Sequence, residues 1–252
     1  MKNNRDRKIK QKIYSIDSIA ILAHELKTPV ITLKEAISLL TDLNKEALNI
    51  KNRRIIAIAQ EEVDRLLRMV DNFLKFASIG AGKIHLEKEK IKIEDIINSV
   101  LEIYSLKIQS KSMHINKLFS KNTPDVVVDW DRMFEAIANI LDNALKYTPT
   151  EGTITVKTQV VNQDHYLLAE RQKTRKHNYL LVTVADTGPG ILKNDLERIF
   201  EKFERGKTSE NIRGIGLGLT ITRNIIKLHN GEVWATSKKN KGAQFYILLP
   251  IS

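Results

Sequence analysis

Cysteine is absent from this sequence of 252 residues. Its absence excludes disulfides, thiolate metal sites and cysteine nucleophiles, and it is typical of a reducing compartment. Long apolar runs are also missing, since none exceeds five residues, whereas a membrane-spanning helix needs about 20. We therefore expect no membrane span and no signal peptide, and a cytoplasmic location, alone or as the inner part of a longer membrane protein.

Acidic residues are outnumbered, because 41 Lys and Arg face 30 Asp and Glu and give a formal net charge of +11. Such a chain favours polyanions, which include nucleic acid, anionic lipid, nucleotide phosphates and acidic proteins. Basic side chains are concentrated near the start, and we interpret residues 1–14 as a solvated basic arm. No nucleic-acid-binding motif accompanies the charge, so we expect no nucleic-acid partner.

Two heptad series predict a pair of helices in residues 15–79. A polar stretch, Thr41 to Glu46, separates them, so the two helices should form an antiparallel hairpin. One hairpin cannot bury both apolar stripes, and we expect a homodimer with a four-helix bundle. The stripes consist of Ile16, Ile19, Ala23, Leu26, Val30, Leu33, Ile37 and Leu40 in the first helix, and Ile56, Ala59, Val63, Leu66, Val70, Phe73 and Ala77 in the second.

The pattern changes after Gly80-Ala81-Gly82, which we interpret as a linker between the hairpin and a second domain in residues 83–252. This second domain mixes strand and helix patterns, and we expect a sheet covered by helices on one face. A polar, basic segment, residues 162–178, is expected to be an extended loop without an assigned role. Strands are expected in residues 83–93, 115–119, 126–128, 153–161, 179–185, 232–237 and 244–249, and helices in residues 94–110, 131–147 and 217–229.

The first chemical motif is HELKTP in the first helix. His24 occupies a heptad position beside the apolar seam, Glu25 is adjacent, and Thr28 lies one turn further on the same face. Pro29 frees the carbonyl of Glu25 at a cost of roughly 3 kcal/mol for a helix interior. An imidazole beside a carboxylate is a plausible nucleophile and base pair.

The second motif is NILDNALKYT, in which Asn139 and Asn143 share one face of an apolar helix and Lys146 follows. Asparagine rarely improves a helix interior, and its amide oxygen is a hard ligand that suits Mg²⁺. The alternative is a buried pair of hydrogen-bonding amides. We favour a polar strip that faces a ligand, because glycine motifs follow.

Two glycine motifs complete the set. DTGPGI places Asp186 at the end of a buried strand, with Gly188 and Gly190 after it, which puts a carboxylate at a pocket with backbone close by. RGIGLGL places glycines just before a helix, where exposed amides favour phosphate. It matches neither a P-loop nor a dinucleotide fingerprint.

The order of these motifs over about residues 15–250 resembles the catalytic core of a two-component sensor histidine kinase. HELKTP resembles the H box of that family, NILDNALKYT its N box, DTGPGI its first glycine box, IFEKFERG its F box and RGIGLGL its second glycine box. The resemblance implies an α + α/β fold. It consists of a helical hairpin that forms a dimeric four-helix bundle, followed by an α/β sandwich ATPase domain of the gyrase and histidine kinase type.

The resemblance also implies roles. His24 would be the phosphoacceptor, Glu25 would polarise it, and Thr28 would position a water during dephosphorylation of a response regulator. Asn143 would ligate Mg²⁺, and Asp186 would accept the adenine amino group of ATP. The other positions would serve the nucleotide or its lid: Asn139 and Lys146 the metal or phosphates, Tyr147 the nucleotide flank, Gly188 and Gly190 the base, Phe200 and Phe203 the lid, Arg205 the γ-phosphate, and Gly214, Gly216 and Gly218 the triphosphate.

The resemblance therefore predicts an autokinase that uses ATP and Mg²⁺ and passes phosphate from His24 to an Asp of a response regulator. Phosphatase activity toward that regulator is expected as well. Two alternatives remain open. One is another ATPase of the same superfamily, such as a chaperone, topoisomerase or anti-sigma serine kinase relative. The other is a nucleotide-binding scaffold without catalysis.

Overall fold

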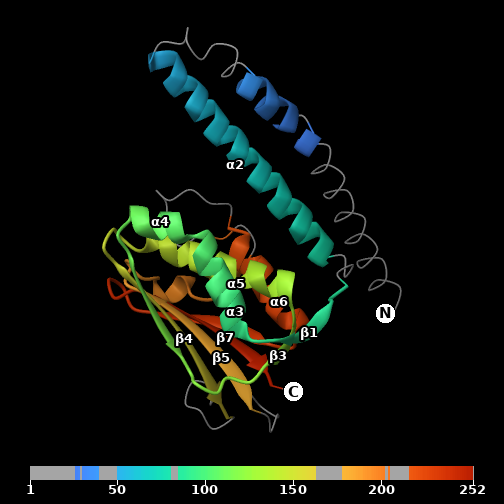
Figure 1. Ribbon diagram of the computed structural model, residues 1–252, viewed down its shortest axis with the longest axis vertical. Coiled ribbons are helices and arrows are strands. Elements are labelled where there is room, and N and C mark those ends of the chain that lie inside the picture. Colours follow the sequence, from blue (N-terminus) through green and yellow to red (C-terminus); the bar gives the residue numbers. More distant parts are fainter. Residues whose placement is uncertain are drawn as a thin grey trace. The chain divides into compact units, whose positions relative to one another are not determined.

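The protein is described here by a computed structural model, which covers residues 26–28, 30–39, 50–80, 85–162, 178–201, 204 and 216–251. Figure 1 labels its helices and strands. The chain divides into two compact units between His85 and Leu86. Each unit is considered by itself.

The N-terminal unit is a helical hairpin. Residues 26–28 and 30–39 are helical, and α2 runs from Ile50–Gly80. Two ion pairs join the helices, because Lys27 Nζ lies 2.5 Å from Asp71 Oδ1 and Lys34 Nζ lies 2.7 Å from Asp64 Oδ1. The residue numbers rise on one helix as they fall on the other, so the helices are antiparallel, as predicted. The polar connection Thr41 to Glu46 lies outside the described residues.

The core heptad positions of the hairpin differ in burial, and three of them, Ile37, Ile56 and Ala59, are half-buried. Val30, Val63 and Val70, which occupy one core position of the heptad, are 7–8% exposed. Leu33 and Leu66 occupy the other core position and are 53% and 45% exposed. A single hairpin thus leaves part of its predicted seam exposed.

The C-terminal unit contains a five-stranded sheet with the strand order β2-β4-β5-β7-β6. Only β2 and β4 are parallel, and the other neighbours are antiparallel. Two further strands, β1 and β3, form a separate antiparallel pair. The strands are β1 (Lys88–Ile91), β2 (His114–Phe119), β3 (Val126–Asp129), β4 (Thr153–Val161), β5 (Tyr179–Asp186), β6 (Glu232–Ser237) and β7 (Ala243–Pro250).

Helices cover one face of this sheet (Figure 1), which confirms the predicted fold class. They are α3 (Ile93–Ile103), α4 (Ser105–Ser110), α5 (Trp130–Tyr147) and α6 (Gly218–Leu228), with short 3-10 turns at Lys193–Asp195 and Arg198–Phe200. Two expectations need correction. The strand expected in residues 83–93 is limited to β1, and the helix expected in residues 94–110 breaks at Tyr104.

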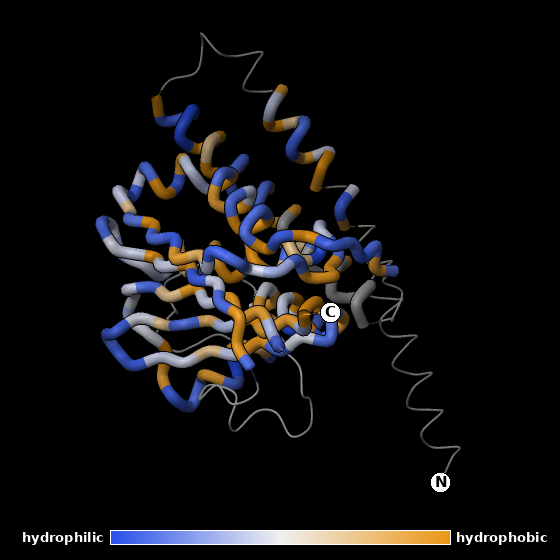
Figure 2. The backbone as a smooth tube through the Cα atoms, turned by 60° about the horizontal axis from the view of Figure 1, so that its bottom comes forward, coloured by the Kyte–Doolittle hydropathy of each residue, from blue (hydrophilic) through white to orange (hydrophobic). Residues whose placement is uncertain are grey.

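The sheet is apolar on both faces at its centre. Apolar residues recur along the strands (Figure 2), and one set of alternate side chains includes the fully buried Ile154, Val156 and Leu180. The opposite set forms a second cluster, in which the rings of Trp234 and Tyr246 stack at 5.1 Å. The members of the cluster are Val161, Tyr179, Leu181, Trp234, Tyr246 and Leu248.

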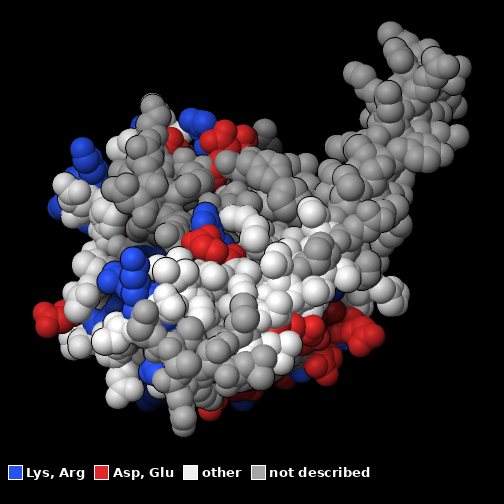
Figure 3. All heavy atoms as spheres, turned by 90° about the horizontal axis from the view of Figure 1, so that it is seen from above, with Lys and Arg blue, Asp and Glu red and all other residues white. Residues whose placement is uncertain are grey.

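The described surface is mixed in charge. Figure 3 shows basic and acidic side chains on the same face, in small separate groups. None of the described helices combines the length and the apolar character that crossing a bilayer requires.

Candidate nucleotide site

Asp186 lies at the end of β5, the middle strand of the sheet. Its Oδ1 atom accepts hydrogen bonds from the backbone N–H groups of Gly188 (2.8 Å) and Ala243 (3.3 Å). Burial raises the pKa of Asp186 above its ordinary value, and the two hydrogen bonds only partly oppose this. No cation among the described residues pairs with it, so this carboxylate is suited to accept a hydrogen bond from a ligand.

The loop after Asp186 passes close to the end of α5. A Cβ atom at Gly188 would lie 2.9 Å from the carbonyl oxygen of Tyr147, so only glycine fits without a shift. Gly190 has a φ of +77°, which glycine adopts without strain. Asp186 and Gly188, predicted from one motif, therefore lie close to Tyr147, predicted from another.

The start of α6 packs against α5 at Asn139. A Cβ atom at Gly218 would lie 3.3 Å from Asn139 Oδ1, and Thr222 Oγ1 donates to the carbonyl of Ala136 at 3.3 Å. The Nδ2 atom of Asn139 is buried and makes no hydrogen bond, which is costly unless a ligand supplies a partner. Asn143 lies one turn further along α5 and is half-buried.

Lys146 is held by a neighbour that sequence reasoning missed. Its Nζ atom pairs with Asp142, whose other oxygen lies 2.9 Å from Lys107 Nζ. Burial acts to raise the pKa of Asp142, but hydrogen bonds from both lysines outweigh it and lower that pKa. Burial, together with the charge of Asp142, raises the pKa of Tyr104 to about 12.

The donor set fits a magnesium–nucleotide complex better than a metal held by protein alone. Within the described ranges, no three His, Asp or Glu side chains gather as metal ligands. The amide oxygens of Asn139 and Asn143 are neutral, and Mg²⁺ in such sites takes substrate phosphates and water as further ligands.

Several predicted residues lie outside the described part of the chain, namely His24, Glu25, Phe203, Arg205 and Gly214. Thr28 is described and is exposed on the first helix. Its carbonyl accepts a hydrogen bond from Thr32 Oγ1 at 3.2 Å, and its own hydroxyl has no partner among the described residues. Gly216 has a φ of +76° and lies just before α6.

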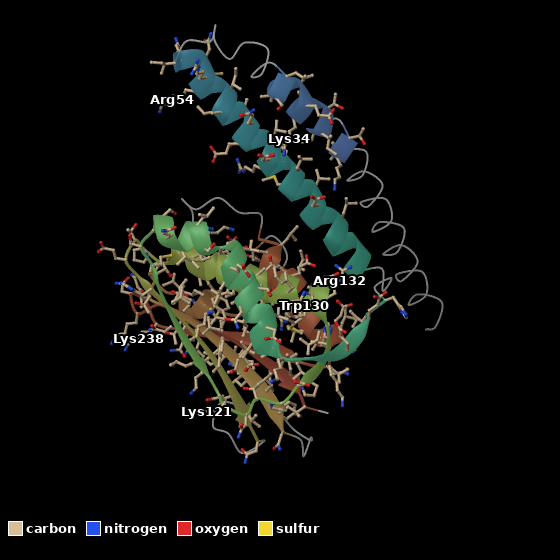
Figure 4. The ribbon with its side chains drawn as sticks, in the orientation of Figure 1. Lys34, Arg54, Lys121, Trp130, Arg132 and Lys238 are labelled. Carbon is tan, nitrogen blue, oxygen red and sulfur yellow. The ribbon has the colours of Figure 1, made fainter. Side chains whose placement is uncertain are left out.

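Sequence reasoning also missed the turn between β6 and β7. Asn240 N donates to the carbonyl of Pro189 at 2.7 Å, and Ile191 N donates to Ser237 Oγ at 2.8 Å. The turn thus contacts the glycine loop directly. Figure 4 places Lys238, in this turn, at the end of the unit opposite Trp130, where α5 begins.

Comparisons with known proteins identify both units. The family model of the His Kinase A (phospho-acceptor) domain matches residues 16–82, and that of the histidine kinase-, DNA gyrase B- and HSP90-like ATPase matches residues 128–252. The chain belongs to the histidine kinase family. A phosphoacceptor domain followed by this ATPase domain is the arrangement of a two-component histidine kinase, so the predicted family is confirmed.

The named relatives of the chain are also sensory or histidine kinases. The chain is 29% identical over 255 residues to the adaptive-response sensory kinase SasA of Synechocystis, covering all of this chain and 63% of that protein. It is 29% identical over 238 residues to the sensor histidine kinase WalK of Bacillus subtilis, covering 92% of this chain and 36% of that one. The chain therefore spans less than two thirds of the length of these relatives.

A solved structure has a similar fold. Full-length ShkA in complex with AMPPNP matches with a TM-score of 0.74 and 27% identity, over 93% of this chain and 45% of that one. The individual site residues named above stay predictions.

Proposed function

We propose that this kinase is an ATP-dependent histidine autokinase of a two-component system. It would transfer the γ-phosphoryl group of MgATP to His24 and then to an Asp of a response regulator. The observation that carries the proposal is the surroundings of Asp186. A half-buried carboxylate has one oxygen that accepts two backbone hydrogen bonds, and it lies near α5, which carries the asparagines, and near the glycine at the start of α6.

Asp186 determines which base is bound. Its Oδ1 atom already accepts two backbone hydrogen bonds, so Oδ2 is left to accept the exocyclic amino group of adenine. A purine that carries a carbonyl at that position would place its acceptor oxygen against Oδ2, which is also an acceptor, and would therefore be rejected. The raised pKa of Asp186 reflects a charge that is poorly solvated, which a bound amino group would stabilise.

The other half of the site would bind the phosphates. The backbone amides at Gly218, at the start of α6, favour negative charge. Asn139 and Asn143 would hold the magnesium ion, which when bound neutralises phosphate charge, and Lys146 would exchange its contact with Asp142 for a phosphate.

The acceptor lies on the hairpin. A nitrogen of the His24 imidazole forms a bond to the γ-phosphorus while the bond to the bridging oxygen breaks and ADP leaves with that electron pair. Glu25 accepts the proton that the imidazole loses. The phosphoryl group then passes from nitrogen to a carboxylate oxygen of the regulator.

We also propose that the kinase is a homodimer. The exposed core positions Leu33 and Leu66 form a row of leucines that one hairpin does not cover. A second hairpin would bury this row, as the dimerisation domain of the family suggests.

The decisive experiment is incubation with γ-labelled ATP, followed by acid and base treatment of the labelled protein. Phosphohistidine is lost in acid and survives in base. His24→Gln should abolish the label and retain ATP binding. A label that survives acid, or that persists in this variant, would contradict the assignment of the acceptor.

Asp186→Asn tests the nucleotide site independently. The amide oxygen would replace Oδ1 opposite the two backbone N–H groups, so an amide N–H₂ would face the purine. ATP affinity should fall by about 10–100-fold, the effect of losing a hydrogen bond to a charged group. Binding of inosine triphosphate, which carries a carbonyl there, should not fall. Unchanged ATP affinity would refute the assignment of Asp186.

A further inference from the structure

We propose that Ser237 is a positioning residue that makes the site selective for the amino group of adenine. It lies at the end of β6 and is half-buried. It was not among the predicted ligand-binding residues, it lies beside one of them, Gly190, and its effect would pass through the backbone that holds Asp186. This inference rests on the proposed role of Asp186.

One hydroxyl connects two segments of the chain. Ser237 Oγ accepts a hydrogen bond from the backbone N–H of Ile191 at 2.8 Å, at the end of the glycine loop. It donates its own hydrogen to the carbonyl of Gly242 at 2.6 Å, across the turn. The hydroxyl thus both accepts and donates a hydrogen bond, and an apolar side chain of similar size can make neither bond.

The second bond controls the direction of a peptide group. The carbonyl of Gly242 and the N–H of Ala243 belong to the same planar peptide, in which the C=O and N–H point in opposite directions. Ser237 holds the carbonyl, and Ala243 N–H donates to Asp186 Oδ1 at 3.3 Å. Ser237 therefore keeps this N–H directed at Asp186.

The result is a difference between the two oxygens of Asp186. Gly188 N–H and Ala243 N–H both occupy Oδ1, which fixes the carboxylate and leaves Oδ2 for the ligand. Without Ser237, the peptide of Gly242 and Ala243 can rotate and the glycine loop loses a bond at Ile191. The carboxylate then no longer presents a single oxygen at a fixed angle.

Loss of Ser237 should leave the fold intact. The backbone bond from Asn240 to Pro189 (2.7 Å) still joins the turn to the loop, and the whole β6–β7 pairing from Glu232 to Ser237 remains. Ser237→Ala therefore tests the direction of the peptide rather than the presence of the turn. Ser237→Thr retains the hydroxyl and serves as the rescue.

Thr236→Ala is the matched control. Thr236 is adjacent on the same strand, but its side chain lies on the other face, where its hydroxyl is 3.2 Å from that of Tyr246. Thr236→Ala thus removes a hydroxyl one position before Ser237, and no hydrogen bond to the glycine loop is lost.

The experiment measures the dissociation constants of ATP and inosine triphosphate for the full chain, with a melting curve for each variant without nucleotide. Ser237→Ala should weaken ATP by about tenfold and inosine triphosphate by much less, so that the preference for ATP falls. Ser237→Thr and Thr236→Ala should keep the preference of the unaltered chain.

Two results would overturn the inference. One is an unchanged preference in Ser237→Ala. The other is an equal loss for both nucleotides, which would mean a general structural role. Asp186→Asn, measured in parallel, separates the two proposals. If it loses the preference and Ser237→Ala does not, only this inference fails, and if neither variant loses it, the adenine site itself is wrong.

Discussion

The backbone N–H of Asp129 donates a hydrogen bond to Nε2 of His229 at 3.0 Å. The other ring nitrogen, Nδ1, lies 2.8 Å from the carbonyl of Ile225 and donates to it, so the buried ring is neutral. The carboxylate of Asp129 in turn accepts from the backbone N–H groups of Arg132 (3.0 Å) and Glu87 (2.9 Å). His229 thus connects the end of α6 with Asp129 at the start of α5, and Asp129 in turn contacts Glu87, near the first residue of the C-terminal unit.

This contact predicts a loss of stability in mild acid. Burial lowers the pKa of His229, aided by the charge of Lys88, whereas the bond to Ile225 and the charge of Asp129 oppose the shift. As the pH falls, His229 is therefore protonated at a higher pH in the unfolded chain than in the folded chain. The free energy of unfolding is fully retained above about pH 6.5 and falls below it, by at most ~1.4 kcal/mol per pH unit.

Tryptophan fluorescence during urea unfolding measures the effect, because Trp130 and Trp234 both belong to the unit that contains His229. The full chain should be less stable at about pH 5.5 than at about pH 7.5. His229→Gln should flatten this difference, whereas His114→Gln, at an exposed position on β2, should keep it. Equal pH dependence in the chain with and without His229 would refute the explanation.

Gly218 should be sensitive to a single methyl group. A Cβ atom there would lie 3.3 Å from Asn139 Oδ1, closer than most side-chain contacts. Gly218→Ala should weaken ATP binding by roughly fivefold, about 1 kcal/mol, while the melting temperature holds, because alanine is the better helix former. Calorimetric titration beside a melting curve measures both, with Leu228→Ala at the other end of α6 as the control. Undiminished ATP affinity would place the phosphates elsewhere.

Much of the C-terminal unit could be predicted from local pattern. The strands β4 and β6 have the predicted bounds, because alternating β-branched residues between polar turns leave little ambiguity. Asp186 and its glycines could be found in the same way, since a strand that ends in an acid and glycine places a carboxylate at an edge. These features depend on neighbours in the sequence.

Features that depend on distant residues were not predictable. The helix break at Tyr104 has no glycine or proline to mark it. Ser237 is one hydroxyl in a polar turn, and its partners are 46 residues upstream and 5 downstream. The ion pair between Lys107 and Asp142 joins α4 and α5, and their packing has to be known before it can be predicted.

The exposed leucine row predicts a dimer that one charge disrupts. Leu66 is 45% exposed at a core position of the heptad. Leu66→Arg would place a charge in the seam between two hairpins, and the molar mass from light scattering should fall to that of one chain. Ile58→Arg is the control, because Ile58 is 54% exposed but lies on the outer face of α2. A monomeric unaltered chain at micromolar concentration, or a dimeric Leu66→Arg, would contradict the bundle.

Thr28 is expected to separate the two activities of the hairpin surface. The residue is exposed, and its hydroxyl has no partner among the described residues, which do not include His24 one turn before it. One turn from His24, it can hold a water near a phospho-aspartate of a bound regulator. It has no part in moving phosphate from ATP to imidazole. Thr28→Ala should therefore keep autophosphorylation and transfer, and it should lose the acceleration of regulator dephosphorylation.

Thr32→Ala is the control for this prediction. Thr32 lies one turn further along, and its hydroxyl donates to the carbonyl of Thr28 at 3.2 Å, so the control removes a hydroxyl from the same helix without removing that of Thr28. The decay of purified phospho-regulator is followed with each variant, and each melting temperature is measured. Both variants should melt like the unaltered chain, because alanine is a strong helix former. A joint loss of both activities and of thermal stability in Thr28→Ala would show that this threonine supports the helix and does not position the water.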